Sequence, residues 1–197
     1  MPIPKILIIP GSLRTGSHNA RLAALAGKEL VLLEAEVTRI SLEDYPLPLF
    51  DADLLTGSGL PRQAIELKNM VGAHQGVFIA SPEYSASISP LIKNAVDWLS
   101  RGRDSSEPNY AVYKGRVFAI GAAANGSTGG LRGLMALRQS LELGCGALVL
   151  PEQITVGRAA QAFDDMDNLK DEAQAGALKA LVRRLIEMAS LMPAAAA

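Results

Sequence analysis

The stretch KILIIPGSLRTGSHN, residues 5–19, decides the fold of this chain. Its first part, Lys5 to Ile9, is a continuous apolar run with β-branched residues that stops at Pro10, which is typical of a strand buried on both faces. A loop with glycines and hydroxyl side chains follows. Apolar residues then recur at helical spacing from Leu22 to Leu33, and Asn19 occupies the position expected of an N-cap. The stretch predicts a strand, a tight loop and a helix in succession.

The alternation of strand and helix continues along the rest of the chain. We predict strands at 36–40, 76–80, 116–121 and 147–150, helices at 60–70, 90–99, 131–141 and 178–188, and a proline-rich loop at 44–50. Ser89 and Pro90 are expected as the N-cap and first residue of one helix, and Pro61 lies in the first turn of another. Five strand–helix units predict a doubly wound α/β fold with a parallel sheet and helices on both faces. We expect one domain over 1–192 and a short tail at 193–197.

The composition excludes several classes of function. The 197 residues include 19 Lys and Arg against 20 Asp and Glu, so a net charge of −1 gives no general attraction to nucleic acid or to an anionic membrane. No apolar run approaches the ~18 residues that a membrane span needs, and no signal peptide is recognisable. A single cysteine argues against a disulfide framework and a zinc-ligand set. These features lead us to expect a cytoplasmic protein.

The loop after the first strand has the residues expected of a phosphate site. A helix N-terminus offers free N–H groups and the positive end of its dipole, and glycines let the backbone approach a ligand. Further donors are the side chains of Ser12, Arg14, Thr15, Ser17 and Asn19 and the backbone N–H of His18. An ordinary strand-to-helix turn with capping serines explains the same residues about equally well. The loop has neither Gly-x-Gly-x-x-Gly nor Gly-Lys-Ser/Thr, which argues against a dinucleotide fold and a nucleoside triphosphatase.

Two further loops follow the strands at 76–80 and 116–121, and in a parallel sheet they reach the same carboxyl edge as the first loop. In the earlier of these loops Pro82 adds stiffness and Tyr84 suits packing against a flat ring, although a lone tyrosine is more often a surface aromatic. The later loop, 122–130, has small residues against which a broad ligand could lie. A flexible turn before a helix is its simpler interpretation.

Together the three loops carry a family resemblance. The strings GSLRTGSHN, SPEYSASISPLIKNAVDWLSR and NGSTGGLRGLMALRQSL resemble the NADPH-dependent FMN reductase family, in matching order over roughly residues 5–156. The family includes chromate, quinone and azo-dye reductases. The resemblance implies a flavodoxin-like doubly wound sheet of five parallel strands, in the order 2-1-3-4-5, with bound FMN.

The resemblance also assigns cofactor-binding positions. The first loop matches positions that hold the FMN phosphate, at Ser12, Arg14, Ser17, His18 and Asn19. The second matches positions whose backbone holds the isoalloxazine ring, at Pro82, Glu83, Tyr84 and Ser85. The third matches positions on the other side of the ring, at Ala123, Asn125 and Gly126. Ser85 stands where the family usually has Asn, and Ser89-Pro90 where it usually has Pro-Gly; neither departure touches the phosphate loop.

An FMN-dependent oxidoreductase is the function that the resemblance implies. Hydride would pass from NADPH or NADH through FMN to a small-molecule acceptor such as a quinone, azo compound, metal oxyanion or free flavin, in a ping-pong scheme. Because the cofactor supplies the chemistry, we predict no catalytic acid, base or nucleophile and no metal. A flavodoxin-type electron carrier is the main alternative, but near-neutral charge and 5% aromatic residues argue against it. A redox-linked binding protein without turnover is a second alternative.

The remaining candidate residues have simpler interpretations. Cys145 is predicted to be a buried free thiol. His18 and His74 are far apart in sequence and show no pattern of a metal site or a catalytic triad. Asp51 and Asp53 are predicted to be solvated loop carboxylates.

Two segments suggest that the chain assembles. The resemblance places Leu91–Ser100 and Tyr45–Phe50 near a partner subunit, and an exposed Pro-Leu-Pro-Leu-Phe run is hard to explain on a monomer. Within the first segment the positions that match the family's helix signature are Lys93, Asn94 and Trp98, which we interpret as a packed helix face. We expect a homodimer or homotetramer with the flavin edge close to the subunit boundary.

Overall fold

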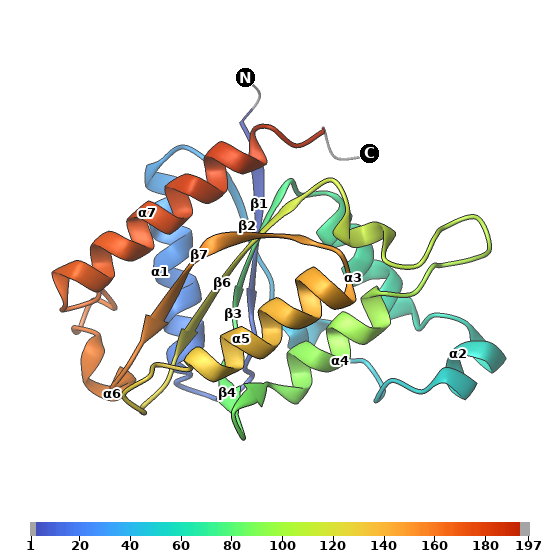
Figure 1. The fold of residues 1–197 in the computed structure, drawn as a ribbon, viewed down its shortest axis with the longest axis horizontal. Coiled ribbons are helices and arrows are strands. Elements are labelled where there is room, and N and C mark those ends of the chain that lie inside the picture. Colours follow the sequence, from blue (N-terminus) through green and yellow to red (C-terminus); the bar gives the residue numbers. More distant parts are fainter. Residues whose placement is uncertain (1–2, 194–197) are drawn as a thin grey trace.

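A five-stranded parallel sheet forms the centre of the computed structural model, which describes residues 3–193 (Figure 1). Its strands lie in the order β2-β1-β3-β6-β7, and each neighbouring pair is parallel. The strands are β1 (Lys5–Pro10), β2 (Glu36–Arg39), β3 (Gly76–Ala80), β6 (Val117–Ala123) and β7 (Leu148–Val156). Counted along this sheet, the order is 2-1-3-4-5. The predicted doubly wound α/β fold is confirmed.

Helices cover both faces of the sheet because each central strand is apolar on both sides. In β1, Ile6 and Ile8 pack into one hydrophobic cluster with α1 and α7, and Leu7 and Ile9 pack into a second cluster with α3, α4 and α5. The helices are α1 (His18–Leu32), α2 (Ala52–Ser58), α3 (Arg62–Gly72), α4 (Pro90–Leu99), α5 (Leu131–Gln139), α6 (Ala159–Ala162) and α7 (Glu172–Ala189). Single turns of 3-10 helix lie at Leu42–Asp44 and Ala111–Tyr113, and a π turn lies at Ser140–Gly144.

The last strand is longer than its apolar run predicts. We expected a strand at 147–150, whereas β7 continues to Val156 through Pro151 and Glu152. An irregularity in the pairing between Phe118 and Ile120 of β6 accommodates these two residues. Because β7 is an edge strand, one side of its backbone needs no partner strand and a proline is tolerated there.

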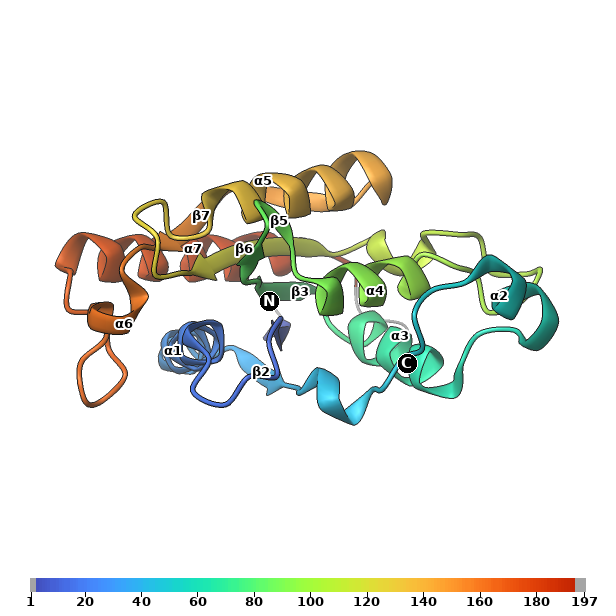
Figure 2. The same ribbon diagram turned by 90° about the horizontal axis from the view of Figure 1, so that it is seen from below.

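Several short elements were not predicted. Asp51 and Asp53 are exposed as predicted, but they do not lie in a plain loop: Asp51 is the N-cap of α2, where its carboxylate accepts from the N–H of Asp53 at 2.8 Å, and Asp53 lies inside that helix. The second loop contains the hairpin β4 (Glu83–Tyr84) and β5 (Ser87–Ile88). α2 and α6 lie at opposite ends of the molecule in Figure 2. Each unpredicted element is seven residues or fewer, too short for a periodic pattern to emerge.

Helix beginnings also differ in detail from the predictions. The N-cap of α1 is Ser17 rather than Asn19, which lies inside the helix. Pro61 is the cap residue before α3 rather than part of its first turn. Ser89 and Pro90 begin α4 as predicted, with the Ser89 hydroxyl accepting from the N–H of Ile92 at 3.3 Å.

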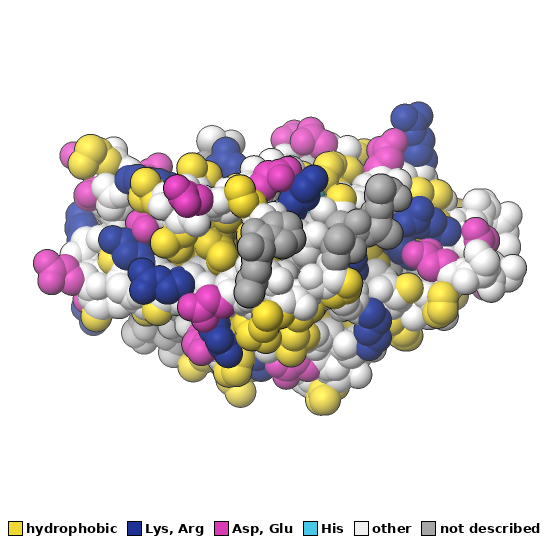
Figure 3. Space-filling view, turned by 90° about the horizontal axis from the view of Figure 1, so that it is seen from above, with side chains coloured by type: hydrophobic (Ala, Val, Ile, Leu, Met, Phe, Trp, Pro, Cys, Tyr) yellow, Lys and Arg dark blue, Asp and Glu magenta, His cyan; other side chains and the backbone are white. Residues whose placement is uncertain are grey.

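The surface at the amino ends of the strands has an even distribution of charge. In Figure 3, Lys and Arg side chains alternate with Asp and Glu over the visible face, and no broad area has a single sign. Within residues 3–193, no helix is both long and apolar enough to cross a membrane. Of the predicted tail at 193–197, residues 194–197 lie outside the described part of the chain.

Candidate functional site

The three predicted loops meet at the carboxyl edge of the sheet, which Figure 2 views. The N–H of Gly11 donates to the carbonyl of Ala80 at 2.8 Å, and the N–H of Ser81 donates to the carbonyl of Gly121 at 2.8 Å. These two hydrogen bonds therefore join the carboxyl end of β1 to that of β3, and the carboxyl end of β3 to that of β6. A ligand above this edge would meet all three loops, as expected at the switch point of a doubly wound sheet.

The first loop leaves donors free at the start of α1. Ser17 caps the helix by accepting from the N–H of Ala20 at 3.3 Å, and Gly16 turns the chain with a φ of 66°. The N–H groups of His18 and Asn19 have no acceptor in residues 3–193. Free N–H groups at a helix N-terminus form an anion site.

Arg14 is exposed and folds back over its own loop. Its guanidinium donates to the carbonyl of Gly16 at 3.1 Å and to that of Thr15 at 3.4 Å. Its backbone N–H donates to the hydroxyl of Ser12 at 3.3 Å. These contacts hold a positive charge beside the helix start, where it would reinforce the attraction of a phosphate.

Ser89 supports the first loop from α4, a contact that the sequence does not reveal. Its hydroxyl donates to the carbonyl of Gly11 at 3.0 Å, and Ser89 is buried. A Cβ on Gly11 would lie 2.7 Å from the Ile92 side chain, so glycine is required for this close approach. The expectation that neither departure from the family pattern touches the phosphate loop is therefore wrong for Ser89, which anchors the beginning of that loop.

His18 places an unsatisfied nitrogen near the same loop. Its Nδ1 is buried and has no hydrogen-bond partner in the described residues. Burial, followed by the positive charges of Arg14 and Arg21, lowers the pKa of the ring and outweighs the opposing effect of the neighbouring Asn125 side chain. A neutral imidazole is favoured. Buried polar atoms without a partner are rare, so this nitrogen is a candidate contact for a bound ligand.

Asn19 makes a different contact from the one predicted. Its side chain is only 3% exposed, and its amide exchanges two hydrogen bonds of 2.9 Å with the backbone of Ala123. The side chain therefore joins the first loop to the third. The backbone N–H of Asn19, which has no acceptor within residues 3–193, remains available to a phosphate.

The second loop is a tight hairpin. Ser85 and Ala86 both have positive φ, 49° and 60°, which matches the two-residue turn that hairpins prefer, although glycine or asparagine is usual there. Tyr84 is about half exposed, so its ring is available to a ligand. Pro82 is buried and begins the turn away from the sheet.

Glu83 holds the hairpin against the start of α5. Its carboxylate accepts from the Nε of Arg132 at 2.9 Å and from the N–H of Gly133 at 3.0 Å. Burial raises the pKa of Glu83, but the Gly133 N–H and the Arg132 guanidinium lower it by more, so the net shift is downward. The Glu83 carboxylate is thus occupied in holding the hairpin, so only the backbone of Glu83 would be available to a flavin ring. Arg132 was not predicted because its partner lies far away in sequence.

The third loop is fixed on its outer side by α6. The Asn125 side chain accepts from the N–H of Ala160 at 3.0 Å, and the carbonyl of Gly126 accepts from the N–H of Arg158 at 3.3 Å. The oxygen of the Asn125 amide is therefore occupied. The loop is held on both sides, so the flexible-turn interpretation does not describe it.

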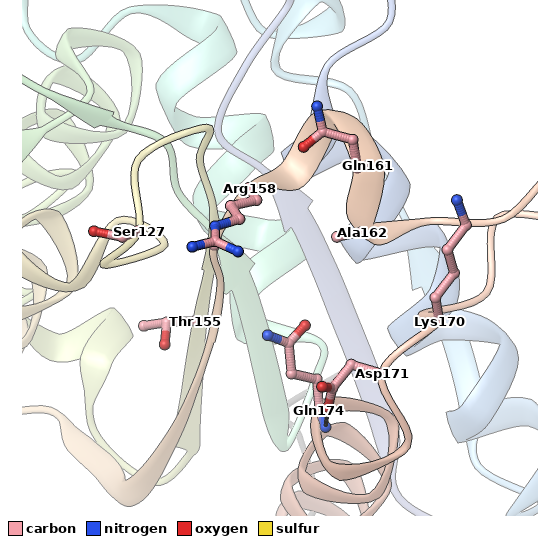
Figure 4. Close-up of a pocket in the computed structure, with 9 residues that line it drawn as sticks. Ser127, Thr155, Arg158, Gln161, Ala162, Lys170, Asp171 and Gln174 are labelled. Carbon is pink, nitrogen blue, oxygen red and sulfur yellow. Dashed lines mark hydrogen bonds between the residues drawn. The ribbon is translucent and has the colours of Figure 1, made fainter.

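A hollow of about 600 Å³ adjoins the third loop beyond the end of β7 (Figure 4). Arg158 and Lys170 reach its border and form no ion pair within the described residues. None of the described lining residues is a predicted cofactor position, so this hollow is a neighbour of the predicted flavin site. Its lining comprises Ser127, Thr155, Gly157, Arg158, Gln161, Ala162, Lys170, Asp171 and Gln174.

Helix α4 fixes the proline-rich loop at 45–50. Asn94 Nδ2 and Trp98 Nε1 both donate to the carbonyl of Pro48, at 2.9 and 2.8 Å, and Asn94 Oδ1 accepts from the N–H of Phe50 at 2.8 Å. The packed-face interpretation is confirmed for Asn94 and Trp98 but is wrong for Lys93, which is exposed and pairs with Asp97. Leu49 is held outward and is 83% exposed.

The other candidate residues take no part in this edge. Cys145 is buried, and burial raises the pKa of its thiol, as expected of an inert core cysteine. His74 is buried with its Nδ1 2.6 Å from the carbonyl of Met70. Across residues 3–193, His, Cys, Asp and Glu form no cluster of three or more that could hold a metal ion.

Comparison with known proteins identifies the family. A family model described as NADPH-dependent FMN reductase matches residues 4–161, most of the chain. The chain belongs to this family. Among the relatives of this chain, an NAD(P)H-dependent FMN reductase of Pseudomonas aeruginosa is 34% identical over 190 residues, which cover 92% of this chain and 96% of that protein. A quinone reductase of Escherichia coli is 34% identical over 138 residues, covering 70% and 69% of the two chains.

A solved structure agrees with the fold. FerB, a flavoenzyme NAD(P)H:(acceptor) oxidoreductase from Paracoccus denitrificans, superposes with a TM-score of 0.76 at 24% identity, covering 96% of this chain and 99% of FerB. The flavodoxin-like architecture of the chain is thereby confirmed. Family membership makes the chain an FMN-dependent oxidoreductase that uses NAD(P)H, as the resemblance implied.

Proposed function

We propose that the carboxyl edge of the sheet binds FMN and that the chain passes electrons from NAD(P)H to a quinone or a similar small acceptor. The observation that carries this proposal is the convergence of the three loops, tied together by the Gly11–Ala80 and Ser81–Gly121 hydrogen bonds. The relatives named FMN reductase and quinone reductase support the choice of acceptor. The predicted cofactor positions are those of the three loops: Ser12, Arg14, Ser17, His18, Asn19, Pro82, Glu83, Tyr84, Ser85, Ala123, Asn125 and Gly126.

The residues at this edge fit the phosphate of FMN. Arg14 supplies an exposed positive charge, and the N–H groups of His18 and Asn19 supply donors without an internal acceptor. The buried, unpartnered Nδ1 of His18 lies on the same helix start. No adenosine-binding fingerprint accompanies the loop, which favours FMN over FAD.

When bound, FMN supplies the two-electron chemistry between NAD(P)H and the acceptor. The chain's own residues bind and orient. Arg14 and the start of α1 would hold the phosphate, and the hairpin backbone at 82–85 would contact the ring. Glu83 keeps that hairpin against α5 through Arg132 and Gly133. No side chain needs to act as an acid, base or nucleophile.

Turnover distinguishes this function from its alternatives. The purified protein should release FMN on denaturation, and NADPH added anaerobically should bleach its visible absorption. A quinone should then restore the absorption and sustain steady NADPH oxidation. Release of FAD, or no binding of added FMN by the apoprotein, would contradict the cofactor assignment. Binding without NADPH oxidation would favour the electron carrier or the redox-linked binding protein.

Assembly and location extend this proposal. We infer a homodimer or homotetramer, supported by the exposed Leu49 on a rigid loop and by a hollow of about 290 Å³ beside it. The hollow is lined by Leu13, Leu42, Glu43, Tyr45, Pro46, Leu47, Leu91, Asn94 and Ala95. Because Leu13 belongs to the phosphate loop, a partner seated here would lie beside the flavin. A cytoplasmic location and a single domain over 1–192 complete the proposal, supported by the single free thiol and by two core clusters on one sheet.

A further inference from the structure

Asn19 joins two loops that are 104 residues apart in sequence. Its Nδ2 donates to the carbonyl of Ala123 and its Oδ1 accepts from the N–H of Ala123, each at 2.9 Å. Both residues are buried, at 3% exposure each. Paired hydrogen bonds in a buried place fix both the distance and the orientation of the groups that they join.

This contact replaces strand pairing at the end of β6, where β3 is too short to pair with Ala123. The N–H of Val117 and the carbonyl of Gly121 bond to the β3 side of β6, and in a parallel ladder Ala123 points the same way. β3 ends at Ala80, however, and the chain turns out of the sheet at Ser81 and Pro82, before it reaches the level of Ala123. The Asn19 amide therefore satisfies the two Ala123 groups that β3 does not reach.

The rest of the third loop is held by elements other than α1. The N–H of Ala124 donates to Val156 of β7 at 3.0 Å, and its carbonyl accepts from Ala159 of α6 at 3.2 Å. Asn19 thus supplies the contact on the α1 side. It is also the second residue of α1, so its own backbone belongs to the helix start that adjoins the phosphate loop.

We infer that Asn19 is a positioning residue that couples the phosphate loop to the ring loop, and that its side chain is not a phosphate ligand. The inference rests on the proposed FMN site. Its consequence is specific: loss of the Asn19 side chain disturbs the loop beside the ring, whereas loss of Arg14 removes a contact to the phosphate alone. Riboflavin, which has the ring without the phosphate, separates these two effects.

The test compares FMN and riboflavin binding to the apoprotein of four chains: the wild type, Asn19→Ala, Asn19→Asp and Leu30→Val. We expect Asn19→Ala to weaken both flavins by roughly ten-fold, since two buried hydrogen bonds are lost. The absorption spectrum of the bound flavin should shift as well. Leu30 is buried at the other end of α1 and controls for general loosening of that helix.

Asn19→Asp separates positioning from helix stability. An aspartate in the first turn favours the helix itself, so a role confined to helix stability predicts little loss of riboflavin binding. The carboxylate cannot donate to the Ala123 carbonyl, so the inferred role predicts weakened riboflavin binding here too. Urea unfolding of each apoprotein shows whether the variants are folded.

Three outcomes would overturn the inference. Weakened FMN with unchanged riboflavin would make the Asn19 side chain a phosphate ligand. If Asn19→Ala weakens flavin binding no more than Leu30→Val does, the Asn19 side chain acts only through the stability of α1. If neither Asn19 variant folds, amide exchange at Ala123 in the wild type decides: slowing by both flavins supports the coupling, and slowing by FMN alone contradicts it. A wild type that binds neither flavin would instead refute the proposed function.

Discussion

Arg14 and Asn19 lie on the same short segment, yet the structure gives their side chains opposite roles. The Arg14 guanidinium is exposed, and within residues 3–193 it donates hydrogen bonds only to carbonyls of its own loop, so a ligand could replace these bonds. The Asn19 amide is buried and committed to Ala123. A sequence motif treats both as phosphate positions because a motif records residue types and not their partners.

Arg14 should therefore discriminate between flavins. A charge-assisted contact to phosphate contributes about 1.5–3 kcal/mol, so we expect Arg14→Ala to weaken FMN binding by roughly ten- to a hundred-fold. Riboflavin binding should be nearly unchanged, because riboflavin has no phosphate. Fluorescence titration of the apoprotein measures both, and Arg39→Ala on the exposed end of β2 is a matched control. Equal weakening of both flavins would assign Arg14 a structural role.

Glu83 should make the fold sensitive to acid. Its pKa is lowered in the folded state, so its contribution is present above the ordinary glutamate pKa of about 4.3 and is lost as pH falls through the lower folded value. We expect Glu83→Gln to reduce the free energy of unfolding by about 1 kcal/mol at pH 7, discounted because Arg132 is largely exposed. Urea unfolding at pH 7 and pH 3 checks this. A difference from wild type that does not shrink at pH 3 would mean that charge is not the cause.

At the scale of elements, local pattern predicts the long elements and fails for the short ones. The bounds of β3 and the start of α4 follow from the sequence, because a fully apolar run and a Ser-Pro cap are local signals. β7 exceeds its prediction, since only pairing with β6 makes a strand of its polar half. The predicted site likewise has some features that local sequence determines and others that depend on tertiary contacts. The three loops are predictable, but the Glu83–Arg132 and Asn19–Ala123 contacts depend on the finished fold.

The β4–β5 hairpin is strained at its turn. Ala86 has a φ of 60°, a conformation that costs a non-glycine residue about 1–2 kcal/mol and that glycine adopts freely. We expect Ala86→Gly to raise the free energy of unfolding by about 0.5 kcal/mol, because the greater conformational entropy of glycine in the unfolded chain offsets part of the relieved strain. Thermal unfolding measures the change. Ala177→Gly, on the exposed face of α7, is the matched control and should lower stability by about 1 kcal/mol. A loss at position 86 as large as this control would refute the strain.

At the scale of the whole molecule, two exposed apolar side chains lie on loops that adjoin the predicted site. Leu13 and Leu49 are 49% and 83% exposed, and Leu13 lines the same hollow as Leu47 and Leu91. The loop that carries Leu49 is not free to fold inward, because Asn94 and Trp98 fix Pro48. Rigid apolar groups beside a ligand site are typical of a surface that a partner covers.

Assembly should thus depend on Leu49. We expect light scattering to give twice or four times the 20.8 kDa of one chain at micromolar concentration. Leu49→Glu should weaken the assembly at least ten-fold, because burying an unpaired carboxylate costs several kcal/mol. Leu32→Glu, on the distant end of α1 at 67% exposure, should leave the mass unchanged. A wild type with the mass of one chain would exclude the assembly. An assembly that survives Leu49→Glu would use another face, and the open side of the flavin would then be shaped within one chain by Tyr84 and the loop at 122–130.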